Sequence, residues 1–194
     1  MDGNTLLSDS AAIANFIVRK SGKTQLLGAD QFEQAQTNQW MQFLRQETTP
    51  LVKAIQWYTF GHAECTAEEY NYVYSLYKEN IKILNNHVKT TKFMVGSSLT
   101  ISDIYLVLTQ VEMQQCLMDT NFKNSLQFIN NIFKHVTTEV SEFKKRMGTV
   151  KGSKKQIMPI FKGAAVEDAS TKAAEQAVKN AKKSKAQTKA QAKK

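Results

Sequence analysis

A hydroxyl residue followed three positions later by a carboxylate, directly ahead of an apolar run, constrains this chain more than any other feature. Thr100 and Asp103 have this spacing, and Ile-Tyr-Leu-Val-Leu follows at 104–108. Such a capping box satisfies backbone N–H groups that the first turn of a helix leaves without partners. Because a helix that is apolar on every side is normally buried, we expect an enclosed central helix from about Thr100 to Met118. Gly96 would let the chain turn sharply just before it.

Helical periodicity also runs through the rest of residues 9–148. A second capping-box pair, Thr66 and Glu69, opens the clearest amphipathic helix. Its apolar residues recur in steps of four and three, at Tyr70, Tyr74, Tyr77, Ile81, Leu84 and Val88. The tyrosines, with Tyr72 among them, are also compatible with base stacking, but the period favours a core. No stretch of the sequence has sustained period-2 alternation, so we predict an all-α fold with six or seven helices.

Composition excludes several classes of protein. The hydrophobic content of 42% suits a globular chain, and no apolar run approaches the roughly 20 residues that a transmembrane helix needs. The N-terminus lacks the basic and apolar regions of a signal peptide. Cys65 and Cys116 have no metal-binding or redox spacing and are expected to be reduced, in a cytoplasmic protein. His62, His87 and His135 are scattered, and no nucleophile stands beside a base, so we expect no metal, no cofactor and no catalytic residue.

Positive charge is concentrated at the C-terminal end. Residues 1–150 contain 14 basic and 14 acidic residues, whereas residues 151–194 contain 12 lysines and three acidic residues, so the net charge of +9 lies in the second segment. Residues 149–163 are predicted to be a linker, with an apolar anchor (Ile157, Met158, Ile160 and Phe161) folded back onto the domain. Residues 164–194 are an alanine- and lysine-rich tail that we expect to be partly helical or disordered.

The tail lysines offer phosphate contacts without base specificity. The candidate nucleic-acid-binding residues are Lys172, Lys179, Lys182, Lys183, Lys185 and Lys189. A solvated tail that only adds solubility is the alternative.

The sequence around the capping box resembles the C-terminal helical domain of glutathione S-transferases and their non-catalytic relatives, the gamma subunits of translation elongation factor 1. The resemblance covers about residues 26–147. Four motifs carry it: Leu26-Leu27-Gly28 with Trp40, Pro50 with Trp57 and Gly61, Lys92-Phe93-Met94-Val95-Gly96, and Leu99-Thr100-Ile101-Ser102-Asp103-Ile104. It implies a helical bundle over residues 26–148, preceded at 1–25 by a remnant of a thioredoxin-like half.

The resemblance also implies what the chain does not do. An acid and a serine at the end of the thioredoxin-like half contact glutathione in active transferases, and Asp9 and Ser10 match them. About 25 residues precede Leu26, whereas the thioredoxin-like half needs about 80, so we expect its strands to be missing. Asp9 and Ser10 are then vestigial, and no transferase activity is expected.

Three functions compete. The first is a translation-associated scaffold that holds nucleotide-exchange subunits of elongation factor 1 or aminoacyl-tRNA synthetases. The second is an RNA-binding accessory protein that contacts tRNA or rRNA through its tail. The third is a degenerate glutathione transferase that uses Asp9, Ser10 and Tyr58. Losing the strands would leave an apolar face for a partner to cover, in part occupied by the helix at residues 9–20.

Overall fold

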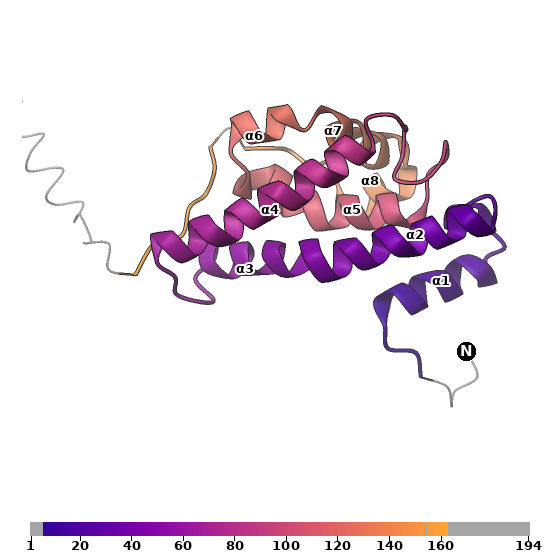
Figure 1. Ribbon diagram of the computed structural model, residues 1–194, viewed down its shortest axis with the longest axis horizontal. Helices are drawn as coiled ribbons and strands as arrows, with labels where there is room; N and C mark the ends of the chain where they lie inside the picture. Colours follow the sequence, from indigo (N-terminus) through magenta and orange to yellow (C-terminus); the bar gives the residue numbers. More distant parts are fainter. Residues whose placement is uncertain (1–5, 154, 163–194) are drawn as a thin grey trace, which may run out of the picture. The chain divides into compact units, whose positions relative to one another are not determined.

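The computed structural model describes residues 6–153 and 155–162. All regular elements within these residues are helical, which confirms the predicted all-α fold (Figure 1). The α-helices are α1 (Ser10–Lys20), α2 (Gln31–Phe43), α3 (Thr49–Thr59), α4 (Ala67–His87), α5 (Ile101–Glu112), α6 (Thr120–Ser125), α7 (Gln127–Lys134) and α8 (Ser141–Met147). A 3₁₀ turn, η1 (Thr24–Leu27), and three π-helical turns, η2 (Leu44–Thr48), η3 (Met113–Leu117) and η4 (His135–Glu139), join them.

Helices α2 and α3 form one nearly continuous rod through the π-helical turn η2 (Figure 1). Pro50 lies in the first turn of α3. Its missing N–H costs little there, because that N–H would have no partner within the helix. At the wider turn η2 the Leu44 carbonyl accepts both the backbone N–H of Thr49 and its hydroxyl, the latter at 2.7 Å.

Helix α4 presents the predicted stripe to the core. The six residues of the stripe, Tyr70, Tyr74, Tyr77, Ile81, Leu84 and Val88, are all buried, in one cluster with residues of α3, α5 and α7. The capping box of Thr66 and Glu69 opens the helix as expected. The prediction that these tyrosines pack in the core is therefore confirmed for Tyr70, Tyr74 and Tyr77, while Tyr72 is exposed.

The Thr100–Asp103 capping box is present at the start of α5, and it is buried. The carboxylate of Asp103 accepts the Thr100 N–H at 2.9 Å and the Met94 N–H at 2.7 Å. It also accepts the Thr100 hydroxyl at 2.9 Å. Gly96 has a φ of +58°, so the sharp turn predicted there exists. One side chain thus fixes both the helix start and the loop before it.

Helix α5 is not enclosed on every side. Leu106, Val107 and Val111 are buried, but Leu108 in the same apolar run is 47% exposed. The prediction of a fully enclosed helix is wrong at this position, because no element of the described chain covers the side of α5 that carries Leu108. That side faces the space between α1 and α3.

Residues 149–161 pack against the C-terminal end of the central helix. Ser153 donates its N–H to the Gln115 carbonyl at 2.5 Å, and Ile157 donates to the Cys116 carbonyl at 2.7 Å. A helix end leaves its last carbonyls without partners, so this extended segment supplies them. Pro159 is buried as well.

The C-terminal helices are shorter than the sequence pattern suggests. Apolar residues recur at helical spacing through residues 122–136, a pattern that by itself favours one continuous helix. Leu126, at φ −91° and ψ 50°, instead separates α6 from α7, and extended Val140 separates η4 from α8. The described chain accordingly has eight α-helices rather than six or seven.

Asp103→Asn should lower the free energy of unfolding by about 2–3 kcal/mol at neutral pH, because an amide nitrogen would face one of three buried donors. Glu69→Gln is the matched control, since Glu69 closes the same kind of box at an exposed helix start. The control should cost about 0.5 kcal/mol. Urea unfolding of both variants measures the difference, and equal losses would show that burial of Asp103 is unimportant.

Candidate functional site

Asp9 and Ser10 begin α1, and the structure gives Asp9 a structural role. Its carboxylate accepts the Ala12 N–H at 2.9 Å as the N-cap of the helix, and it forms an ion pair with Arg45. The Ala12 N–H and the Arg45 guanidinium together hold the pKa of Asp9 below its usual value. Ser10 faces a groove beside α5.

The groove lies between α1 and α5, with α2 at one end. Its lining is almost entirely apolar and encloses about 290 Å³. The lining residues are Ser10 and Ala14 of α1, Met41 of α2, and Ile101, Ile104, Tyr105 and Leu108 of α5.

A second groove of about 320 Å³ continues on the other side of α5, toward α3. Tyr105 and Leu108 line both grooves, so they form a shared ridge. The second groove also contains Val52 and Lys53 of α3 and Met147 of α8. We call the two together the α5 groove. Polar residues also line the half toward α3, where Gln56 donates to Glu112 at 2.5 Å.

The α5 groove offers binding rather than acid–base chemistry. General acid–base catalysis needs a titratable group positioned at the reacting atoms, and the groove contains Lys53, Tyr105 and Glu112 among apolar side chains. The carboxylate of Glu112 is already occupied by the Gln56 amide. An apolar half beside a mixed, partly polar half is compatible with a protein-binding site, since protein interfaces combine apolar and polar surface.

The three histidines lie away from the groove, His62 in the turn after α3 and the other two in helical segments. His87 stacks on Trp40 at 4.1 Å and bonds the Met94 carbonyl through Nε2 at 2.8 Å. His135 contacts Glu139 at 2.5 Å. Among the described residues, no three His, Cys, Asp or Glu side chains gather as metal ligands would. No helix in the same part of the chain has the length and apolarity to cross a bilayer.

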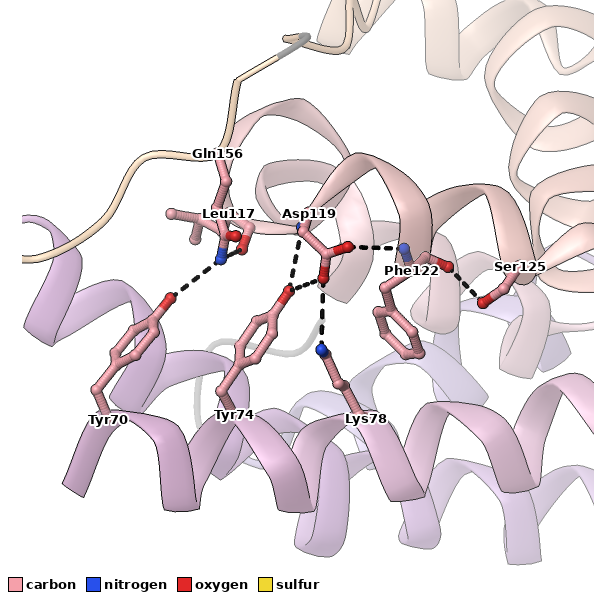
Figure 2. A network of polar contacts seen from close by, with 8 residues as sticks. All are labelled: Tyr70, Tyr74, Lys78, Leu117, Asp119, Phe122, Ser125 and Gln156. Atoms are coloured by element: carbon pink, nitrogen blue, oxygen red, sulfur yellow. Dashed lines mark hydrogen bonds and ion pairs between the residues drawn. The ribbon is translucent and has the colours of Figure 1, made fainter. Parts of the chain in front are cut away.

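Tyr70 and Tyr74 of α4 are occupied by internal contacts, as Figure 2 shows. The hydroxyl of Tyr74 accepts the Asp119 N–H at 3.2 Å, and the Asp119 carboxylate caps α6 through the Phe122 N–H at 2.8 Å. Lys78 approaches the same carboxylate at 3.4 Å and lies over the rings of Tyr74 and Phe122. Burial raises the pKa of Tyr74 well above its usual value. These rings are therefore not available for stacking on bases.

The same network ties residues 149–161 to α4. The side-chain amide of Gln156 donates to the Leu117 carbonyl at 3.0 Å and to the Tyr70 hydroxyl at 3.4 Å (Figure 2). The ring of Phe161 meets the ring of Tyr70 edge-on at 5.8 Å. Gln156 and Phe161 therefore hold this segment against Tyr70 of α4.

The sequence did not point to the α5 groove. Ala14, Tyr105 and Leu108 belong to apolar patterns that predict burial equally well, and only the arrangement of α1, α3 and α5 leaves them open. The sequence indicated only Asp9 and Ser10 as candidate site residues next to the groove. The tail positions Lys172, Lys179, Lys182, Lys183, Lys185 and Lys189 lie outside the described residues.

Comparison with known proteins identifies sequence relatives. No protein-family model matches the chain. "Probable elongation factor 1-gamma 2" of Arabidopsis thaliana is 28% identical over 145 residues, which are 74% of this chain and 34% of that protein. "Elongation factor 1-gamma-A" of Xenopus laevis is 26% identical over 147 residues, 75% of this chain and 32% of that protein. The chain thus spans about a third of the length of the relatives it matches.

Solved structures show the same fold. The GST-like domain of elongation factor 1-gamma from Saccharomyces cerevisiae superposes with a TM-score of 0.71 at 20% identity, over 79% of this chain and 73% of that one. Poplar glutathione transferase F1 superposes with a TM-score of 0.62 at 18% identity, over 76% and 72%. The chain therefore has the helical fold of the glutathione S-transferase C-terminal domain and is similar in sequence to elongation factor 1-gamma, as the motifs indicated.

Asp119→Asn should remove a pH-dependent part of stability. Burial opposes ionisation of Asp119, but the Phe122 N–H and the Lys78 ammonium outweigh it and lower the pKa. A carboxyl with a lowered pKa stabilises the fold above its unfolded pKa of about 3.9, and this contribution is lost as the pH falls through the folded pKa. The variant should lose about 0.5–1 kcal/mol at pH 7 and progressively less as the pH falls below about 3.9.

Unfolding free energies from pH 3 to pH 7 test this difference. Glu142→Gln is the control, because Glu142 is an exposed carboxylate with distant partners in α8, and it should match the wild type throughout. A loss from Asp119→Asn that is as large at pH 3 as at pH 7 would show that the charge is not its source.

Proposed function

We propose that this chain is a non-catalytic protein-interaction module of translation, and that the α5 groove holds its protein partner. The supporting observation is the α5 groove, in which Leu108 is exposed and Tyr105 is partly exposed on a helix whose other apolar residues are mostly buried. Similarity to elongation factor 1-gamma over three quarters of the chain supports the link to translation.

The arrangement of the groove weighs against a transferase. In this alternative Asp9 and Ser10 would bind glutathione with Tyr58 nearby. The Asp9 carboxylate already caps α1 and pairs with Arg45, and Tyr58 packs against the core cluster. A ligand would have to compete with these contacts.

The proposed partner is a nucleotide-exchange subunit of elongation factor 1, in the cytoplasm. An aminoacyl-tRNA synthetase is the second candidate partner. Both interactions would bury the open ridge of α5, and an exposed apolar ridge gains free energy when a partner removes it from water.

Leu108→Asp should weaken binding to a purified nucleotide-exchange subunit about thirtyfold or more, because it places a charge on the apolar ridge. Ile83→Asp is the matched control. Ile83 is 50% exposed on α4, close to the 47% of Leu108, and lines neither half of the groove. Isothermal titration calorimetry with each variant gives the dissociation constants.

Equal weakening by the two variants would show that the groove is not the binding site. No binding of the wild-type chain to exchange subunits or to synthetases would contradict the proposed function. Glutathione-conjugating activity of the purified chain would contradict its non-catalytic part.

Binding of tRNA or rRNA is a second candidate function, favoured by the 12 lysines of residues 151–194. Such binding should weaken steeply with salt, because lysines displace counterions from the phosphate backbone. Deleting residues 163–194 removes eight of these lysines and should abolish binding to a tRNA in a filter assay at low salt. Unchanged binding by the truncated chain would rule out the tail as the RNA-binding element.

A further inference from the structure

Helix α1 has apolar residues on its buried side and also on a side that no other element of the described chain covers. Ala11 and Val18 are buried in a small cluster with Leu27, Met41 and Ile101. This cluster holds α1 against α2 and α5, and α1 lies beside α2 in Figure 1. A helix that packs on one side only is normally polar on the other.

The outward side of α1 is instead apolar. Ile13, Phe16 and Ile17 have the spacing of one helical face, and Phe16 and Ile17 are 41% and 55% exposed. Single exposed apolar residues are common on protein surfaces. These three lie side by side, so they form a patch.

The patch continues the α5 groove. Ala14 lines the groove, and Ile17 follows it by three residues, which places the two side chains on neighbouring rows of the helix. Apolar surface therefore runs from Leu108 and Tyr105 across Ala14 and onto the outward side of α1. A partner that fills the groove would meet this patch next.

Positive charge borders the patch. Arg19 and Lys20 end α1, and Lys23 follows in the turn, whereas no acidic residue occurs between Ser10 and Ala29. Lys20 lies 5.8 Å over the ring of Phe16. Asp9, at the opposite end of the helix, already has Arg45 as its ion-pair partner.

We propose that the outward face of α1 (Ile13, Phe16, Ile17, Arg19, Lys20 and Lys23) docks an acidic protein segment, with apolar side chains on the patch and carboxylates opposite the three cations. This inference rests on the proposed function and extends its site. Complementary charge favours such a segment. An anionic membrane would also attract the cations, but the patch is continuous through Ala14 with the α5 groove, the proposed protein site, so a protein segment is favoured.

The double charge reversal Arg19→Glu with Lys20→Glu tests the proposal. It should weaken binding to the purified nucleotide-exchange subunit about tenfold or more at low salt and flatten the salt dependence, because charges at an interface rim mainly set the association rate. Lys144→Glu with Lys145→Glu in α8 is the control, with an equal change in charge away from α1. Circular dichroism confirms that each variant folds.

A second probe separates this inference from the proposed function. It is a synthetic helical peptide with leucine on one face and glutamate along its edges, titrated by fluorescence anisotropy into the wild-type chain and both double variants. Loss of peptide binding only in the α1 variant supports the docking face, even where the exchange subunit does not bind at all and the proposed function fails.

Three results would overturn the inference. The first is exchange-subunit binding that the α1 variant leaves unchanged, in which case the proposed function stands without it. The second is no binding of either probe. The third is binding to phosphatidylserine vesicles that the α1 variant abolishes while the peptide does not bind, which would assign the face to a membrane.

Discussion

The buried carboxylate of Asp103 is the contact on which the arrangement of the helices depends. It accepts three hydrogen bonds, from the Met94 N–H and from the N–H and hydroxyl of Thr100. Burial alone raises the pKa of Asp103, and these donors oppose that rise. Because donors from the loop and from the helix start meet on one group, the direction of α5 is fixed relative to residues 94–100. The side of α5 that remains open follows from this direction.

The opposite end of the central helix depends on a segment distant in sequence. Residues 149–161 supply donors to the carbonyls of Gln115, Cys116 and Leu117, and Gln156 joins them to Tyr70. A buried helix end without such partners would lose about 1–3 kcal/mol for each unsatisfied group. Val150 and Phe161 of this segment pack against the core beside α4. Ile157, Met158 and Ile160 of the predicted apolar anchor are instead exposed, so the anchor prediction is wrong for these three residues.

The sequence predicted those features that depend on local chemistry. Thr66 with Glu69 and Thr100 with Asp103 cap helices because hydroxyl and carboxylate reach neighbouring N–H groups in any fold. Leu106 and Leu108 show the limit, since both lie in one apolar run and only Leu106 is buried. Their difference depends on which helices pack beside α5, and periodicity within one helix contains no such information. The α5 groove was missed for this reason. The prediction for α4 was correct because neighbouring helices cover every residue of its apolar stripe, as periodicity alone assumes.

The central claim is that α1, α3 and α5 leave one apolar surface open, and that a translation protein covers it. Hydrogen–deuterium exchange of the complex with a nucleotide-exchange subunit measures this most directly, because amides slow down where a partner excludes water. The account predicts slower exchange in residues 10–20 and 101–112, with no change along α4. Slower exchange confined to α4, or none in α1 and α5 at saturating partner, would contradict it.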